Sequence, residues 1–234
     1  MTRNSMNKQY QVLVIGNGKL AKEILDNLKT ASVSSVISWN DKSSLNKLPI
    51  IVVHAGSGRE LGDAISFCSE KKSLLIDLST SSHLKTEEIL FPAIVCPNVN
   101  ILMLKFMLMI KNCGHLFENY KKAILESHQS SKTSKPGTAL ILAEPLGLRD
   151  DEIKSVRDPD VQEKELGVPP EHLARHAYHR IEITEENVTL KFEATVFGQS
   201  AYANGLGMII EGITSRILEP RVYDVLELVA HGWV

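Results

Sequence analysis

The first part of the chain alternates short apolar runs with segments in which apolar residues recur at helical spacing. The apolar, β-branched runs predict strands at 10–15, 35–39, 49–54, 73–77 and 93–96. The amphipathic segments predict helices at 19–30 and 59–71. Because each predicted strand is nearly continuous in apolar residues, we expect a parallel sheet covered on both faces, and hence a Rossmann-like α/β domain up to about residue 98.

The hydrophobic pattern changes after Pro97 and Asn98. Helices are predicted at 101–119 and 138–144, with a strand at 120–126 between them. The charged, proline-containing segment 149–171 indicates an exposed excursion. This part of the chain therefore predicts a second domain of a different character.

The last part of the chain begins with polar and apolar residues in alternation. The segments 175–183 and 188–197, around a turn at 184–187, predict an antiparallel hairpin with one solvated face. Helices are predicted at 201–218 and 223–229, apolar enough to pack back on the first domain. The fold class is therefore α/β, with an N-terminal Rossmann-like parallel sheet and a second α+β domain.

Composition narrows the range of functions. The 234 residues suffice for one large or two modest domains, and a net charge of -2 gives no electrostatic reason to expect nucleic acid. The spacing of Cys68, Cys96 and Cys113 fits neither a metal site nor a disulfide framework, so we expect reduced, mostly buried thiols. The polar N-terminus and the short apolar run at 101–110 predict a cytoplasmic protein without a membrane partner.

The motif Gly16-x-Gly18-x-x-Ala21 follows a predicted strand and opens a predicted helix. In this context glycines allow a tight turn and a close approach to a pyrophosphate, which then lies at the helix N-terminus. The alternative is a glycine-rich connection in some other α/β protein. The candidate cofactor-binding residues are Gly16, Asn17, Gly18, Lys19, Leu20 and Ala21.

The residue that selects the cofactor's ribose is expected about 20 positions further on. Asp41 would favour a free 2′-hydroxyl, whereas Lys42 or Lys47 could accept a 2′-phosphate, so NADH and NADPH both stay open.

A second glycine loop, 54–59, follows the third predicted strand and ends on the same edge of the sheet. Ala55 and Gly56 could line the cofactor there, and Ser79 and Thr80 could lie near the nicotinamide. Ordinary turns are the alternative.

The segment 126–139 gathers His128, Lys132 and a Gly137-Thr138 turn within fourteen residues. An ammonium group, backbone N–H groups and a hydroxyl can surround one carboxylate, and a histidine can add a proton or a hydrogen bond. A solvated surface lysine is the alternative for Lys132 alone. The segment therefore predicts a site for a small acidic ligand.

The residues Glu126-Ser-His-x-x-x-Lys132-x-x-x-Pro-Gly137-Thr138-Ala139 resemble the signature of the dihydrodipicolinate reductases (4-hydroxy-tetrahydrodipicolinate reductases) of bacterial lysine biosynthesis, commonly E-A-H-H-R-H-K-x-D-A-P-S-G-T-A. Three other segments resemble that family in the expected order, so the similarity spans nearly the whole chain. They are the asparagine-containing crossover at 97–100, the F-A-x-G-like segment at 202–205 and the C-terminal segment 220–228.

The resemblance implies a dinucleotide-binding domain formed by 1–98 and 203–234, and a domain at 99–202 for substrate binding and oligomerisation. It implies NADH or NADPH as reductant, a cyclic dicarboxylate substrate and a homotetramer, with a homodimer as the other option. The implied reaction is the reduction of 4-hydroxy-tetrahydrodipicolinate to tetrahydrodipicolinate. A related nicotinamide-dependent enzyme for another imino or amino acid, or a non-catalytic nucleotide-binding protein, stays open.

The resemblance also assigns roles by position. Lys132 matches the active-site lysine, credited with substrate binding and protonation, and Gly137 and Thr138 match the turn that holds a substrate carboxylate. His128 matches the first histidine of the H-H pair, and His179 a strand histidine in G-E-H-T. Asn98 lies in the crossover and is counted with the cofactor site.

The chain departs from the family pattern at several positions. Gln129 replaces the second histidine, Gln199 replaces an arginine, the serine before Gly137 is absent, and the first domain is short between its first two strands. A glutamine can donate a hydrogen bond to the substrate but not a proton, so Lys132 or a water must supply one. His176 and His179 face opposite sides of a strand, and of the two we favour His179 for the site.

Overall fold

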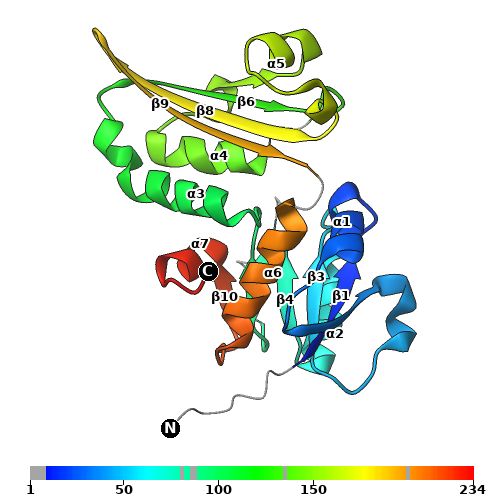
Figure 1. The fold of residues 1–234 in the computed structure, drawn as a ribbon. Coiled ribbons are helices and arrows are strands. Elements are labelled where there is room, and N and C mark those ends of the chain that lie inside the picture. The colour runs from blue at the N-terminus through cyan, green and yellow to red at the C-terminus, as the bar shows by residue number, and fades with distance from the viewer. Residues whose placement is uncertain (1–8, 80–81, 85–88, 134–135, 199–200) are drawn as a thin grey trace. The chain divides into compact units, whose positions relative to one another are not determined.

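The computed structural model describes residues 9–79, 82–84, 89–133, 136–198 and 201–234. The chain divides into two compact units (Figure 1): Met1–Leu104 with Tyr202–Val234 form unit 1, and Lys105–Ala201 form unit 2. Within the described ranges no helix combines the length and the apolar character needed to cross a membrane.

Unit 1 is built on a six-stranded parallel sheet in the order β10-β5-β4-β3-β1-β2. Its strands are β1 (Tyr10–Ile15), β2 (Val33–Ser38), β3 (Ile50–His54), β4 (Leu74–Asp77), β5 (Ala93–Val95) and β10 (Val222–Asp224). Its helices are α1 (Lys19–Asn27), the 3-10 helix η1 (Trp39–Ser44), α2 (Leu61–Lys71), α6 (Ala201–Thr214) and α7 (Val225–Ala230). The predicted parallel, Rossmann-like sheet is confirmed.

The order of the strands fixes where a ligand can bind in unit 1. β1 lies between β2 and β3 in the sheet. The connection after β1 therefore leads to the strand on one side of β1, and the connection after β2 crosses back to the strand on its other side. In open α/β sheets, ligands bind beyond the carboxyl ends of the strands at such a switch point. The two glycine loops begin at the carboxyl ends of β1 and β3.

The prediction of a helix at 223–229 is wrong at its start. Val222–Asp224 form β10, which pairs with β5 and extends the sheet, and α7 begins only at Val225. The side chain of Asp224 accepts a hydrogen bond from the backbone N–H of Leu226, which caps the N-terminus of α7. A strand of three residues is too short for its period to be read from the sequence.

Unit 2 contains a four-stranded sheet in the order β7-β6-β8-β9, with α3 and α4 on one face and α5 on the other (Figure 1). Its strands are β6 (Lys121–His128), β7 (Ile153–Val156), β8 (His176–Glu185) and β9 (Val188–Phe197). Its helices are α4 (Gly137–Ala143), α5 (Pro159–Lys164) and the 3-10 helices η3 (Gly114–Phe117), η4 (Glu144–Leu146), η5 (Asp150–Glu152) and η6 (Pro170–His172). The helix α3 (Ile101–Cys113) contains the boundary between the units.

The predicted hairpin of unit 2 is confirmed as β8 and β9, which pair antiparallel along their whole length. The predicted excursion at 149–171 is exposed over most of its length, but it is not separate from the fold. It contains β7, which pairs parallel with β6, and α5, and it buries Ile153, Val156 and the side chain of Gln162. The sequence of β7 does not show the alternation of apolar and polar residues that is typical of a strand, because its two buried residues are at its ends and the two residues between them are exposed.

Candidate active site

The two glycine loops of unit 1 pack directly on each other. Gly16 has φ +130°, and a Cβ atom there would lie 2.6 Å from the carbonyl oxygen of Ala55. The backbone N–H of Ala55 donates to the carbonyl of Ile15 over 2.7 Å. Only glycine permits both the backbone conformation and this contact, so Gly16 sets the shape of the turn.

The rest of the first glycine motif leaves room for a ligand. A Cβ atom on Gly18 would meet no atom within 4 Å. Gly18 is also the N-cap residue of α1, where no side chain caps the helix and no acidic residue lies in the first turn. Backbone N–H groups at the start of a helix attract an anion, so this end of α1 can hold a phosphate.

The other predicted cofactor residues of unit 1 lie near the carboxyl ends of its strands. Asp41 is exposed in η1, and the ammonium group of Lys42 lies 4.3 Å from the ring centre of Trp39. Asn98 follows β5, and its side-chain oxygen accepts a hydrogen bond from the N–H of Asn100. Thr80 lies outside the described residues.

A buried histidine–aspartate pair joins the ends of β3 and β4. Nδ1 of His54 lies 2.7 Å from Oδ1 of Asp77, and neither residue is exposed to solvent. Ser79, a predicted cofactor residue, donates its backbone N–H and its hydroxyl to the same carboxylate. Burial raises the pKa of the Asp77 carboxyl, but hydrogen bonds from His54, Ser82 and Ser79 outweigh burial and lower it.

In unit 2, the pairing of β6 with β8 decides which polar residues share a face. Glu126 lies opposite His179, and His128 lies two residues further on the same face. Ser127 and His176 belong to the other face, where their side chains lie 2.9 Å apart. As predicted, His179 and His176 point to opposite sides, and His179 is on the side of His128.

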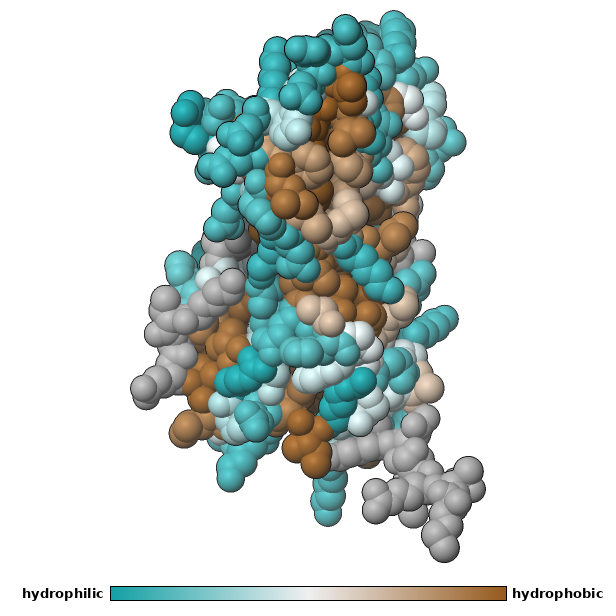
Figure 2. Space-filling view, turned by 90° about the vertical axis from the view of Figure 1, so that its left-hand side faces the viewer, coloured by the Kyte–Doolittle hydropathy of each residue, from teal (hydrophilic) through white to brown (hydrophobic). Residues whose placement is uncertain are grey.

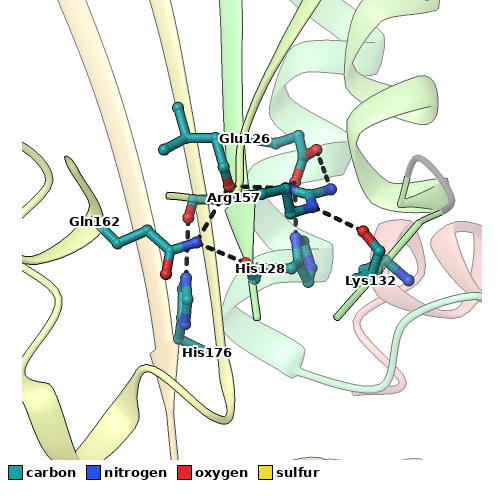
Figure 3. Close-up of polar contacts among 8 residues, drawn as sticks. Glu126, His128, Lys132, Arg157, Gln162 and His176 are labelled. Carbon is teal, nitrogen blue, oxygen red and sulfur yellow. Dashed lines mark hydrogen bonds and ion pairs between the residues drawn. The ribbon is translucent and has the colours of Figure 1, made fainter. Parts of the chain in front are cut away.

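The Glu126 carboxylate is the centre of the polar network on this face (Figure 3). It lies 2.6 Å from Nη2 of Arg157 and 2.8 Å from Nδ1 of His128, and the residue is fully buried. Burial raises the pKa of Glu126, but hydrogen bonds from His128, Arg157 and Ser155 outweigh burial and leave it at about 2. The carboxylate is therefore ionised at neutral pH and orients the ring of His128.

His179 is a buried histidine beside this network. Among the described residues neither of its ring nitrogens has a hydrogen-bond partner, and its ring packs edge-to-face against His128, with centres 5.5 Å apart. Burial, together with repulsion from His128, lowers its pKa to about 3. His179 is therefore neutral at physiological pH, with two nitrogens available to a polar group that reaches it.

The turn that carries Lys132 is held at both of its ends. The carbonyl of His128 accepts a hydrogen bond from the side chain of Gln162, and the carbonyl of Lys132 accepts one from Nε of Arg157 over 3.0 Å (Figure 3). Between them the N–H of Lys132 donates to the carbonyl of Gln129. Glu126, His128 and His179 thus share one face of the sheet, and the turn of Gln129 and Lys132 follows directly after His128. Gly137 and Thr138 form the first turn of α4.

Comparison with known proteins gives relatives by sequence and by fold. The chain is 29% identical to 4-hydroxy-tetrahydrodipicolinate reductase 1, chloroplastic, of Arabidopsis thaliana over 160 residues, which are 62% of this chain and 46% of the relative. A probable reductase of the same name from Oryza sativa subsp. japonica is 29% identical over 164 residues, 64% of this chain and 48% of the relative. The chain resembles the 4-hydroxy-tetrahydrodipicolinate reductases.

A solved structure supports the resemblance at the level of the fold. A dipicolinate-bound dihydrodipicolinate reductase from Paenisporosarcina sp. TG-14 has a TM-score of 0.64 and 14% identity, and the match covers 92% of this chain and 97% of that one. No protein-family model matches the chain. The chain spans about half the length of the curated reductases it matches.

Four residues of these sites were missed by the sequence analysis. Arg157 and Gln162 belong to the segment whose charged composition predicts an exposed excursion, and His54 and Asp77 lie in strands that are predicted from their apolar residues. A signal existed for α5, because Asp158 and Pro159 form a typical helix start and Asp158 does cap it.

Proposed function

We propose that this protein reduces 4-hydroxy-tetrahydrodipicolinate to tetrahydrodipicolinate with NADH or NADPH, a reaction of the diaminopimelate route to lysine. The observation that carries the proposal is the cluster on one face of unit 2, where a Glu126-oriented His128, the turn of Lys132 and the buried His179 lie together. The similarity to reductases named for this substrate supports it.

The residues of unit 1 fit a dinucleotide. The left-handed turn at Gly16, the open space beside Gly18 and the uncapped start of α1 provide what a pyrophosphate requires. When bound, a reduced nicotinamide supplies a hydride. Asp41 and Lys42 are both exposed after β2, so the choice between NADH and NADPH is left to measurement.

We derive the role of unit 2 from the charges that its residues carry. Loss of the 4-hydroxyl as water leaves a conjugated imine in the substrate ring, which must take up one hydride and one proton. Lys132 neutralises a substrate carboxylate and makes the ring a better hydride acceptor, and Gly137 and Thr138 hold a carboxylate by hydrogen bonds. Gln129 donates a hydrogen bond but no proton, so the proton comes from Lys132, from His128 or from a water.

The test is an assay of NADPH and NADH oxidation with freshly generated 4-hydroxy-tetrahydrodipicolinate. We expect oxidation that depends on the substrate, and the ratio of kcat/KM for the two cofactors identifies the physiological one. Cofactor binding without oxidation of either dinucleotide would refute the proposed reaction.

Gln129 favours a second candidate within the same chemistry. Because it stands where the family pattern has a proton-carrying histidine, the substrate could be another cyclic imino acid or an amino acid. The same assay with a panel of imines separates the two: a kcat/KM higher for another imine would assign the protein to that substrate.

We propose that unit 2 also forms a homotetramer, or at least a homodimer. Its strand β9 is an edge strand, and Figure 2 shows hydrophobic residues exposed on the face of the protein that is turned to the viewer. The exposed large hydrophobic residues of this unit are Met109, Leu116, Tyr120, Val188 and Leu190. Edges of this kind are usually covered by a partner. Light scattering on wild type and Leu190→Glu tests this: a wild-type monomer would refute it.

The cytoplasm is the location that we propose for this protein. The plant relatives are named chloroplastic, so fractionation of cells that produce the full chain is the measurement that decides.

A further inference from the structure

All three nitrogens of the Arg157 guanidinium group donate hydrogen bonds to Glu126, to Val156 or to Lys132. Nη2 and Nη1 donate to the two oxygens of Glu126 over 2.6 and 3.2 Å, and Nε donates to the carbonyl of Lys132 over 3.0 Å. Nη1 also donates to the carbonyl of Val156, directly before it in the chain. A lysine could not make this set of contacts, because only the planar fork of an arginine presents several donors at fixed angles.

The contact with Lys132 is part of a two-point attachment. The turn from His128 to Lys132 is held by Gln162 at its first carbonyl and by Arg157 at its last. Both side chains come from the segment after β7, so this segment acts as the support for the lysine turn. Misplacement of a catalytic group by about 1 Å can cost a hundredfold in rate, so such a support has functional weight.

The contact with Glu126 pairs Arg157 with a buried carboxylate that His128 also contacts. The Glu126 carboxylate is fully buried and ionised, and it accepts hydrogen bonds from Arg157, His128 and Ser155. With Arg157 present, the pair Glu126–Arg157 is neutral, and His128 need not carry a positive charge. Without Arg157, the buried carboxylate would hold a second proton on His128, because an unpaired buried charge is costly.

Several charged or titratable groups lie around His128. Glu126 lies on its own strand, His179 and His176 lie on β8, and Arg157 follows β7. Glu126, which is in hydrogen-bond contact with His128, carries the negative charge of this cluster. Arg157 is the cation that offsets Glu126.

We propose that Arg157 is a positioning residue, which anchors the turn of Lys132 and shares the Glu126 carboxylate with His128. The role of Arg157 in turnover rests on the proposed reductase function, but its effect on His128 does not.

The experiment compares Arg157→Met with the matched control Arg149→Met, which removes an exposed arginine from the same segment. NMR of the ring signals, assigned with His128→Asn, follows the pH at which His128 takes up its proton in the cofactor-free protein. We expect this pH to rise by about one unit or more in Arg157→Met and to stay unchanged in Arg149→Met. An unchanged midpoint in a folded Arg157→Met would overturn the proposal.

The second readout separates positioning from charge. Arg157→Lys keeps a cation near Glu126 but loses the fork, so the His128 midpoint should stay closer to that of the wild type while kcat falls roughly 10- to 100-fold. Wild-type turnover in Arg157→Lys would refute the anchoring of Lys132. If Arg157→Met does not fold, the NMR test uses Arg157→Lys and the double variant Glu126→Gln/Arg157→Met. In the double variant, the pH at which His128 takes up its proton should be lower than in the wild type. If the wild-type protein has no reductase activity, the proposed function fails, but the NMR measurement still tests the effect of Arg157 on His128.

Discussion

Nδ1 of His54 lies 2.7 Å from Oδ1 of Asp77, between two side chains that have no exposed surface. The two residues are register partners at the carboxyl ends of the neighbouring strands β3 and β4. Asp77 also binds Ser79, so one carboxylate ties together two strand ends and the residue that follows them. This pair shapes the edge of the sheet where we expect the cofactor.

We expect Asp77→Leu to lower the free energy of unfolding by about 3 kcal/mol or more. Removing one member of a buried pair leaves the other without a partner, which costs more than the pair itself contributes. For the same reason, His54→Leu/Asp77→Leu should cost less than the sum of the two single changes. Urea unfolding measures all three, with Glu70→Gln as a control at an exposed pair. Strict additivity would contradict this account.

The two glycines of the first loop should respond differently to alanine. Gly16→Ala places a Cβ atom against the Ala55 carbonyl at φ +130°, so we expect a loss of about 1–3 kcal/mol in stability together with weaker cofactor binding. Gly18→Ala meets no protein atom, so its stability should stay within about 1 kcal/mol of the wild type while NADPH affinity falls. Thermal unfolding and fluorescence titration with NADPH separate the effects. Unchanged affinity in Gly18→Ala would argue against a pyrophosphate beside it.

The buried His179 predicts a loss of stability in mild acid. Its pKa is about 3 in the folded protein and 6.5 when unperturbed, so the unfolded chain binds the proton more readily. Its contribution to stability is complete above about pH 6.5 and is lost as the pH falls toward 3, by up to about 1.4 kcal/mol for each pH unit. When urea unfolding is measured between pH 7 and 4, the free energy of unfolding should depend less steeply on pH in His179→Leu than in the wild type. His115→Leu, at an exposed position, is the control and should keep the wild-type slope.

The sequence predicted those parts of the fold that are determined by residues close to one another in the chain. The strands at 10–15 and 50–54 are nearly continuous apolar runs, and the turn at Gly16 follows from two glycines between a strand and a helix. Each of these features depends on a few neighbouring residues, so the pattern alone contains the information. Strand alternation also places Glu126 and His128 on one face of β6, but the pairing of β6 with β8, which brings His179 to that face, was not predicted.

The contacts that hold the site together are not local. Arg157 is 31 residues from Glu126, and His54 is 23 residues from Asp77. A polar residue in a charged segment is usually solvated, so nothing in the sequence alone distinguishes Arg157 from the exposed Arg149. Only the parallel pairing of β7 with β6 brings the guanidinium to the carboxylate.

Lys132 is the residue on which the proposed chemistry depends most directly. Its backbone is fixed through its carbonyl and its N–H, and its side chain is half-buried rather than packed in the core. We therefore expect Lys132→Ala to lower kcat/KM by about a hundredfold or more while the midpoint of thermal unfolding changes little, because the backbone contacts do not require the ammonium group.

The control for this change is Lys154→Ala, which removes an exposed lysine from β7 without touching the network. Steady-state kinetics and calorimetry on both variants give the comparison. Titration with dipicolinate adds a measurement that does not depend on turnover: the ammonium group should contribute to the affinity for a dicarboxylate, so Lys132→Ala should bind it at least tenfold more weakly than Lys154→Ala, a loss of about 1.4 kcal/mol. Near-normal turnover and affinity in Lys132→Ala would remove Lys132 from the site, because neither the neutralised carboxylate nor the activated ring could then depend on its charge.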